Sequence, residues 1–182
     1  KEYIFDGDIF QCVVSRRFEA DYKNSLINAY RVLRSTNPSP YMVYMSIDGD
    51  EIISTSPETL VKLQNGVLNT FPIAGSRPRG KTDTEDNALA DELIHDEKEL
   101  AEHNMLVDLG RNDIGKISEF NSVKVTKYQE VLRYSKIMHI CSEVEGELKD
   151  GLDAFDAVES LLPAGTLSGA PKIRACQIID EL

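Results

Sequence analysis

Apolar residues alternate with polar ones along several stretches of this chain and recur every three or four positions along others. The alternating and Val- or Phe-rich runs predict strands over 9–20, from 66 into a Gly-, Pro- and Arg-rich loop at 72–80, and twice within 122–148. A hairpin is expected over 41–56, because Asp48-Gly49-Asp50 separates two alternating halves and is typical of a tight turn.

The period of three to four residues predicts helices within five stretches: 21–40, where Pro38 and Pro40 end the helix, 56–63, 83–109, 153–162 and 171–182. Ser56 and Pro57 are expected to begin the second helix, and Asp96 is expected to restart the third, with Glu99 three residues on. Pro163 is expected to end the fourth. Helices and hairpins follow one another without a regular strand–helix–strand rhythm, which predicts an α+β fold.

Composition narrows the class of protein. At 182 residues the chain is one domain or most of one, and its apolar fraction of 41% is that of an ordinary globular protein. The net charge of −11 argues against nucleic-acid binding, since phosphate backbones require a basic surface. An anionic small ligand stays open, because a metal ion or a local Arg and Lys cluster reverses the field within one pocket.

The cysteines and the chain ends bear on location and completeness. Cys12, Cys141 and Cys176 are odd in number and lack C-x-x-C spacing, so reduced thiols in the cytoplasm are expected. No apolar run approaches the length of a membrane span, and no membrane association is expected. The first residue is not Met and the last helix lacks a stop signal, which leads us to expect a piece of a longer polypeptide.

Four residues of the helix at 83–109, Glu92, His95, Glu99 and Glu102, are spaced by three, four and three positions and share one face. A solvated acidic face is one interpretation. A metal site is the other, because Glu99 and Glu102 repel each other beside the apolar stripe of the helix, and a hard cation offsets that cost. Mg²⁺ is favoured over zinc, since the H-E-x-x-H motif is absent.

Two loops rich in small residues are candidate ligand sites. The loop at 163–172 precedes a helix whose free N–H groups favour an anion, and the loop at 72–80 places a Gly and a hydroxyl beside two arginines. The cations expected to assist are Lys172, Arg174, Arg77 and Arg79. Each loop alone is compatible with a plain turn. Together with the acidic helix they predict a carboxylated substrate held between a metal ion and backbone donors.

Seven stretches of the sequence resemble, in the same order, motifs of the chorismate-utilising enzymes. They are GDIFQCVVSRRF, NPSPYM, SPETLVKL, PIAGSRPRG, DEKELAEHNMLVDLGRNDIGK, YSKIMHICSEVEGEL and PAGTLSGAPKIRA. The resemblance covers nearly the whole chain and favours the anthranilate synthase component I group. It implies large, mostly antiparallel sheets layered with helices. It also implies that residues 1–182 are part of a chorismate-binding catalytic domain, with an N-terminal regulatory part and a C-terminal remainder outside this sequence.

The resemblance also implies roles for individual residues. Glu102 and Glu99 match the carboxylates that bind Mg²⁺, which in turn holds the carboxylate on the chorismate ring. Gly75, Ser76 and Thr166 match substrate contacts, although many relatives have Thr in place of Ser76. Mg²⁺ is accordingly the cofactor that the resemblance implies.

Further matches concern catalysis and the choice of nucleophile. His139 matches a histidine beside the ring and the enolpyruvyl group, and its other interpretation is a satisfied histidine of the core. Glu58 matches the acid that protonates the departing ring hydroxyl. Gln11 stands where isochorismate and salicylate synthases carry a Lys base that activates water, and Ala74 where many aminodeoxychorismate synthases carry a Lys nucleophile. Both residues favour attack by ammonia.

The implied activity is that of a lyase of tryptophan biosynthesis, in which ammonia adds at ring carbon 2 of chorismate, the hydroxyl leaves and pyruvate is eliminated to give anthranilate. A glutamine amidotransferase subunit is the implied source of ammonia. Pro40, Tyr41 and Met42 match half of the pocket where tryptophan inhibits, and are otherwise a Pro-rich turn entering a strand. The alternatives are an aminodeoxychorismate synthase component I that lacks the Lys, and a non-catalytic fragment, since further metal ligands and a substrate arginine of the family lie outside these residues.

Overall fold

The computed structural model describes residues 1–134 and 136–182, and the chain forms two compact units. One, here called the hairpin unit, is Ser15–Thr59. The other, the sheet unit, combines Lys1–Val14 with Leu60–Leu182. Among the helices of the described residues, none has both the length and the apolar character that crossing a membrane requires.

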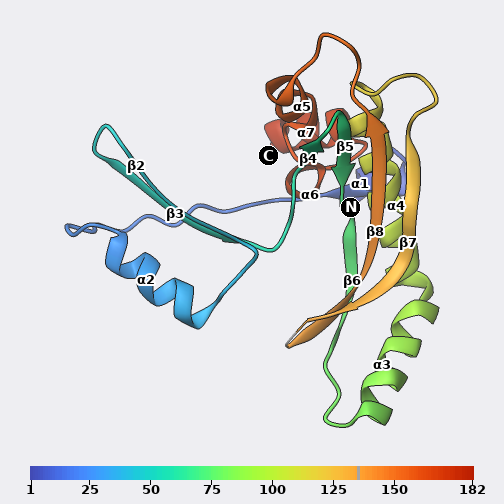
Figure 1. Ribbon diagram of the computed structural model, residues 1–182, viewed down its shortest axis with the longest axis horizontal. Coiled ribbons are helices and arrows are strands. Elements are labelled where there is room, and N and C mark those ends of the chain that lie inside the picture. The colour runs from blue at the N-terminus through green and yellow to red at the C-terminus, as the bar shows by residue number, and fades with distance from the viewer. Residues whose placement is uncertain (135) are drawn as a thin grey trace. The chain divides into compact units, whose positions relative to one another are not determined.

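The hairpin unit consists of one helix and two antiparallel strands (Figure 1). Helix α2 spans Ile27–Thr36, strand β2 spans Tyr41–Ile47 and strand β3 spans Asp50–Ser56. The turn between the strands has two residues, Asp48 and Gly49, with φ of 52° and 93°, and such a turn suits the right-handed twist of the strands. The expected hairpin is confirmed with a turn one residue shorter than predicted, and the expected helix begins six residues later.

A five-stranded antiparallel sheet with β8 in its middle forms the sheet unit (Figure 1). Its strands are β4 (Lys62–Gln64), β5 (Val67–Thr70), β6 (Ile73–Pro78), β7 (Lys124–Arg133) and β8 (Ile137–Glu147). One edge of β8 pairs with β5 and then with β6, while its other edge pairs with β7. The antiparallel α+β arrangement expected from the sequence is thus confirmed.

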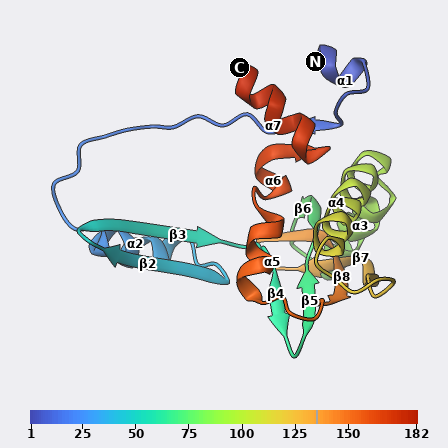
Figure 2. The same ribbon diagram turned by 90° about the horizontal axis from the view of Figure 1, so that it is seen from above.

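Two long helices, α3 (Asp83–His95) and α4 (Glu97–Gly115), lie on one face of this sheet (Figure 2). The break between them falls at Asp96, as predicted. The Asp96 carboxylate accepts hydrogen bonds from the N–H groups of Lys98 and Glu99, at 3.0 and 3.2 Å. This cap fixes the first turn of α4, the helix that carries both candidate metal ligands.

Shorter elements complete the sheet unit: α1 (Glu2–Phe5), β1 (Gln11–Cys12), α5 (Ala154–Leu161), α6 (Gly165–Ser168), β9 (Gly169–Ala170) and α7 (Lys172–Glu181). Asp153 caps α5 in a reciprocal capping box with Asp156, as a capped helix there predicts. Strand β1 pairs with β9. The loop expected at 163–172 therefore contains a helical turn and a strand, because its backbone groups pair with those of the N-terminal segment.

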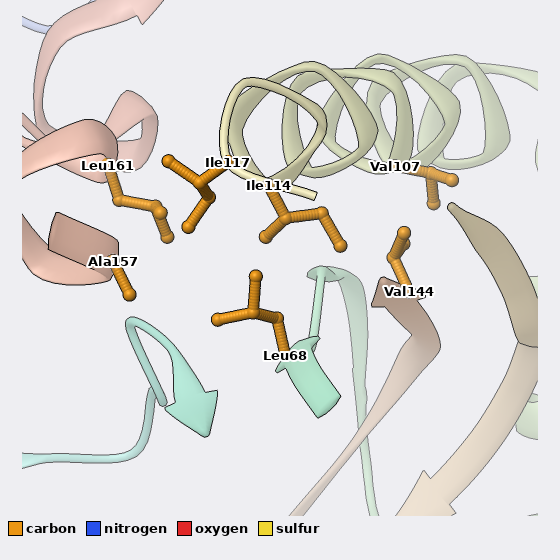
Figure 3. Close-up of a cluster of buried hydrophobic side chains, with 7 residues drawn as sticks. All are labelled: Leu68, Val107, Ile114, Ile117, Val144, Ala157 and Leu161. Carbon is orange, nitrogen blue, oxygen red and sulfur yellow. The ribbon is translucent and has the colours of Figure 1, made fainter. Parts of the chain in front are cut away.

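One hydrophobic core of the sheet unit lies where α4 and α5 meet β5 and β8 (Figure 3). Its buried side chains are Leu68, Val107, Ile114, Ile117, Val144, Ala157 and Leu161. Burial of each large aliphatic side chain contributes about 1.5–3 kcal/mol. A second cluster of Ala90, Leu93, Met138 and Ile140 joins α3 to β8. The two clusters hold α3 and α4 against the sheet and so determine which way the polar residues of α4 point.

Three predicted elements differ in the structure. The strand expected over 9–20 shrinks to Gln11–Cys12, because the partner with which it pairs, β9, has only two residues. The helix expected over 56–63 is an irregular segment followed by β4, whose Leu63 packs against the core. Finally, most of the loop expected at 72–80 is strand β6.

Candidate functional site

Gly75 interrupts β6 with a bulge, where the pairing with β8 shifts between Ala74 and Ser76. Its φ is +77°, in the left-handed region. A Cβ at this position would lie 3.1 Å from Ile140, 3.2 Å from Glu99 Oε2 and 3.3 Å from Leu93. Glycine is therefore required for both backbone conformation and space, and its backbone closely approaches the Glu99 carboxylate.

His139 lies on β8 directly opposite Ser76. Its Nδ1 is 3.2 Å from the Gly75 carbonyl oxygen, and its ring meets the Tyr134 ring edge-on at 5.8 Å between centroids. Met138 and Ile140 on either side are fully buried, whereas His139 is only half-buried, so it points to the opposite face of the strand. It is therefore not a histidine of the core, and the structure brings it together with Gly75 and Ser76.

Glu99 approaches the Gly75 bulge from α4, on the face of the sheet opposite His139. Its carboxylate is 3.6 Å from the Arg77 guanidinium, which also contacts Glu92 at 3.0 Å and Asp96 at 2.9 Å. Arg77 is thus surrounded by carboxylates of α3, α4 and the cap between them. Its charge holds Glu99 beside the bulge of β6.

Glu102, one turn further along α4, faces a pocket of about 810 Å³. Gln11 of β1 and Ala170 of β9 line the same pocket, together with Phe10, Met105 and Pro171. Apolar atoms make up most of the exposed lining, and its polar side chains are Gln11, Lys98, Glu102, Asp108 and Asn112. The structure thus brings Gln11 and Glu102 to one cavity, a juxtaposition that helical spacing alone does not predict.

The two acidic residues of α4 are compatible with Mg²⁺, which commonly takes only one or two protein carboxylates and completes its shell with water or substrate oxygens. In residues 1–134 and 136–182, no group of three or more His, Cys, Asp and Glu side chains is arranged to hold a metal ion. The described residues therefore offer part of an oxygen-ligand set, and Mg²⁺ remains a prediction.

The remaining candidates lie elsewhere. Thr166 is exposed on α6, next to Gly165, whose backbone abuts Leu109 of the pocket wall. Glu58, an exposed residue, belongs to the hairpin unit, where its N–H donates to Ser56 Oγ at 3.2 Å. The structure describes Glu58 within that unit only, so its role as the acid for the departing hydroxyl remains a prediction.

The candidate tryptophan contacts also belong to the hairpin unit. Tyr41 and Met42 begin β2, and exposed Pro40 precedes them. The Tyr41 hydroxyl is 2.5 Å from Thr59 Oγ1, and the Met42 carbonyl accepts a hydrogen bond from Tyr30 at 3.4 Å. The Pro-rich entry to a strand is confirmed, and the role in effector binding stays a prediction.

The cations expected to help bind a substrate carboxylate have partners within the chain. Lys172 contacts Asp113 and Arg174 contacts Asp8, at 2.8 and 2.7 Å. Arg77 is surrounded as described above. These guanidinium and ammonium groups neutralise carboxylates of their own fold, so the expectation that they face a ligand is wrong in this structure.

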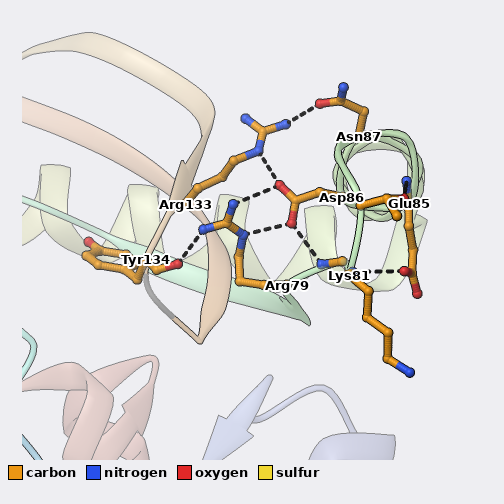
Figure 4. Close-up of polar contacts among 9 residues, drawn as sticks. Arg79, Lys81, Glu85, Asp86, Asn87, Arg133 and Tyr134 are labelled. Atoms are coloured by element: carbon orange, nitrogen blue, oxygen red, sulfur yellow. Dashed lines mark hydrogen bonds and ion pairs between the residues drawn. The ribbon is translucent and has the colours of Figure 1, made fainter.

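Arg79 belongs to a network centred on Asp86 (Figure 4). The Asp86 carboxylate accepts hydrogen bonds from Arg79 at 2.7 and 3.1 Å, from Gly80 N–H at 2.8 Å and from Arg133 at 3.0 Å. The Arg79 guanidinium and then the Gly80 N–H hold the pKa of Asp86 at about 2, below its ordinary value of 3.8. Arg79 also donates to the Tyr134 carbonyl, so the network fixes the residue whose ring meets His139.

Two residues near this site were not predicted from the sequence. Tyr134 precedes His139 by five positions and directly follows strand β7. An aromatic residue at the end of a predicted strand is the sequence feature that indicates it. His103 is fully buried, with Nε2 2.6 Å from Ser142 Oγ, and burial lowers its pKa. Helical spacing predicts the burial of His103, because Leu100 and Val107, three and four positions away, place it on the apolar stripe of α4.

All 182 residues match the family model described as chorismate binding enzyme. The chain belongs to the chorismate binding enzyme family. The family expected from the seven motifs is thereby confirmed. The residues gathered around the β6 bulge and the pocket come from five of those motifs, which are separated along the chain and adjacent in the sheet unit.

Individual members of the chorismate binding enzyme family show how similar the chain is to known proteins. It is 56% identical to anthranilate synthase component 1 of Acetivibrio thermocellus, over 100% of this chain and 37% of that protein. It is 50% identical to aminodeoxychorismate synthase component 1 of Bacillus subtilis (strain 168), over 100% of this chain and 39% of that protein. The crystal structure of anthranilate synthase component I from Streptococcus pneumoniae TIGR4 is 52% identical, with a TM-score of 0.87, over 100% of this chain and 40% of that one. The chain thus has the fold of these enzymes and spans about two fifths of their length.

Proposed function

We propose that this chain is part of an anthranilate synthase component I, which converts chorismate and ammonia to anthranilate, pyruvate and water. The observation that carries the proposal is the meeting of Ser76 and His139 at the Gly75 bulge, which Glu99 approaches from the α4 face of the sheet, in a member of the chorismate binding enzyme family. The bulge thus brings a hydroxyl and an imidazole together on one face of the sheet and lies against a carboxylate on the other.

Each residue has a chemical task in the proposed reaction. The Gly75 backbone and the hydroxyls of Ser76 and Thr166 bind and orient the substrate. His139 lies beside the ring and the enolpyruvyl group, and Glu58 gives a proton to the ring hydroxyl as it leaves. Glu99 and Glu102 would hold Mg²⁺, which supplies charge stabilisation at the ring carboxylate when bound.

The nucleophile is proposed to be ammonia. Gln11 lines the pocket beside Glu102, and an amide there cannot take a proton from water. Ala74 precedes the bulge on β6 and offers no amine for a covalent intermediate. Both residues support amination over hydration or covalent capture of the ring.

The product decides between the two candidate branches. The full-length protein is incubated with chorismate, Mg²⁺ and ammonium, and the products are separated by chromatography. Anthranilate is expected, without isochorismate. Accumulation of aminodeoxychorismate would instead favour the folate branch, an alternative supported by the 50% identity to a Bacillus subtilis aminodeoxychorismate synthase component 1.

The proposal extends to partners and to the isolated chain. A glutamine amidotransferase subunit supplies ammonia, tryptophan inhibits at Pro40, Tyr41 and Met42, and the enzyme acts in the cytoplasm.

Residues 1–182 are proposed as part of the catalytic domain, and alone they are expected not to turn over chorismate, because two carboxylates leave most of an octahedral Mg²⁺ shell to other ligands. A fluorescence assay for anthranilate on residues 1–182, with the full-length protein as positive control, tests this.

A further inference from the structure

The Lys172 ammonium is one of the most completely satisfied charges in the sheet unit. Its Nζ lies 2.9 and 2.8 Å from the two Asp113 carboxylate oxygens and 2.9 Å from the Leu161 carbonyl oxygen. The Lys172 and Asp113 side chains are only 11% and 10% exposed. Three acceptors match the three N–H donors of the ammonium, so Lys172 has no donor left for a ligand.

The three contacts of Lys172 join places that are distant along the chain. Leu161 ends α5 and Lys172 begins α7, so the ammonium ties together both ends of residues 162–171, here called the clasped segment. Asp113 lies on α4, 11 residues or about 16 Å along the helix from Glu102. One ion pair thus fixes the clasped segment to the helix that carries the candidate metal ligands.

The clasped segment contributes to the candidate site in two ways. It carries Thr166, and its last residues, Ala170 and Pro171, form part of the pocket wall. It also positions the N-terminal strand, because Ala170 O accepts a hydrogen bond from Phe10 N–H at 2.8 Å and pairs with Gln11. Movement of this segment would displace both Gln11 and Thr166 relative to Glu102.

We propose that Lys172 and Asp113 are positioning residues, and that their ion pair sets the distance between the clasped segment and α4 and thereby the affinity for the substrate. The proposal rests on the function proposed above. Buried ion pairs contribute little net stability compared with apolar residues of similar size, because desolvation offsets their attraction, so geometry is the property that this pair supplies.

The test uses the full-length protein with Lys172→Met, which keeps the length of the side chain and removes the ammonium. Lys116→Met is the matched control, since Lys116 also contacts Asp113, at 3.0 Å, but its side chain is 53% exposed and lies on α4 itself. The measurements are the KM for chorismate and kcat in ammonium-dependent anthranilate formation, and amide hydrogen exchange across the chain.

For Lys172→Met we expect KM to rise about tenfold or more with kcat within about threefold, and exchange in the clasped segment to accelerate about tenfold, because removal of one partner of a buried ion pair leaves the other charge unpaired. Lys116→Met is expected to change each quantity less than about twofold, as an exposed pair does. Asp113→Asn keeps one acceptor, so we expect it to raise KM and accelerate exchange in the clasped segment by smaller factors. This variant replaces Lys172→Met in the test should Lys172→Met not fold.

Unchanged KM and unchanged exchange in the clasped segment would overturn the proposal. So would equal acceleration of exchange throughout the sheet unit, because that result assigns the pair to general stability. Should the wild-type protein form no anthranilate, the proposed function fails, whereas the exchange of residues 162–171 still decides whether the clasp exists.

Discussion

Glu99 and Glu102 lie three residues apart on α4 and occupy different surroundings. Glu99 is 21% exposed in its side chain, 3.6 Å from the Arg77 guanidinium, and against the bulge at Gly75. Glu102 faces the pocket beside Gln11, and within the described parts of the chain no Lys, Arg or His nitrogen lies within 4 Å of its carboxylate. One carboxylate is held by the fold and the other is open to a ligand.

Helical spacing alone leaves the surroundings of the two glutamates undetermined. Residues three apart share one face of a helix, and the sequence accordingly predicts equal roles for both glutamates. The sheet covers only part of that face, so Glu99 meets β6 while Glu102 meets the cavity. A ligand cation therefore competes with Arg77 at Glu99, whereas Glu102 faces the pocket without an ion pair among the described residues.

The largest expected effect comes from Glu102→Gln in the full-length protein. Loss of one anionic ligand from the proposed Mg²⁺ site is expected to lower Mg²⁺-dependent turnover by about a hundredfold or more while the fold stays intact. Turnover is measured across a Mg²⁺ titration, with circular dichroism as the check on folding. Glu97→Gln, an exposed change on the same helix, is the control. Activity of the Glu102 variant within a few-fold of wild type would remove Glu102 from the metal site.

The second test alters the backbone of the β6 bulge, against which the Glu99 carboxylate lies. Gly75→Ala is expected to destabilise the protein by about 2–4 kcal/mol, from the left-handed φ and from crowding against Ile140, Glu99 and Leu93. Gly66→Ala is the matched control, because its φ is +79° but nothing lies within 4 Å of an added Cβ, so about 1 kcal/mol is expected. Denaturant unfolding measures both.

Equal losses in the two glycine variants would mean that the approach of Glu99 to the bulge does not restrain that carboxylate. The ion pair with Arg77 would then be the remaining restraint that distinguishes the Glu99 carboxylate from that of Glu102 among the described residues. A larger loss at Gly75, accompanied by weaker Mg²⁺ activation, would tie the position of Glu99 to the geometry of β6.

The elements that the sequence predicts well are those with local chemistry. Asp96 breaks the helical tract because its carboxylate caps the next helix, and Asp48-Gly49 turns the hairpin because both residues accept φ above zero. The false helix at 56–63 had a clear counter-signal. Asn65-Gly66, with φ of 53° and 79°, is a strong hairpin signal, and it fixes β4 against β5.

The candidate site was less predictable, because its geometry depends on contacts between distant segments. Motif resemblance implied substrate contacts at Gly75 and Ser76 and a ring neighbour at His139, but nothing local shows that β6 and β8 pair with Ser76 opposite His139. The cations were misjudged for the same reason. A Lys in a Gly-rich loop has the same local pattern whether it faces a ligand or, as Lys172 does, a buried carboxylate on another helix.

The third test concerns the Asp86 network, which fixes the end of β6, the strand that contains the bulge beside Glu99. Because the pKa of Asp86 is about 2 when folded and 3.8 ordinarily, the unfolded chain binds more protons at this position between these values. Its contribution to stability is therefore present above 3.8 and lost as the pH falls toward 2. Asp86→Asn should be less stable than wild type at neutral pH, and the difference in Tm should shrink as the pH falls from about 5 to about 2.

Asp91→Asn, at an exposed position of α3, is the control for the general effect of acid. A difference in Tm between wild type and Asp86→Asn that stays constant across this pH range would mean that the ion pairs with Arg79 and Arg133 do not stabilise the folded state. The pocket around Glu102 is expected to be unaffected, so Mg²⁺ activation of Asp86→Asn at neutral pH should stay close to that of wild type.

The smallest expected effect separates the partners of Arg77. Glu92 contacts Arg77 at 3.0 Å, but its side chain is 60% exposed, and exposed ion pairs contribute little because water and salt screen them. Glu92→Gln should therefore shift Tm by less than about 2 °C and leave Mg²⁺ activation unchanged. Asp96→Ala should lower Tm more, because it removes a helix cap as well as an ion pair. Scanning calorimetry compares the two variants. A larger loss for Glu92→Gln would show that the exposed partner, and not the cap at the start of α4, orients Arg77 toward Glu99.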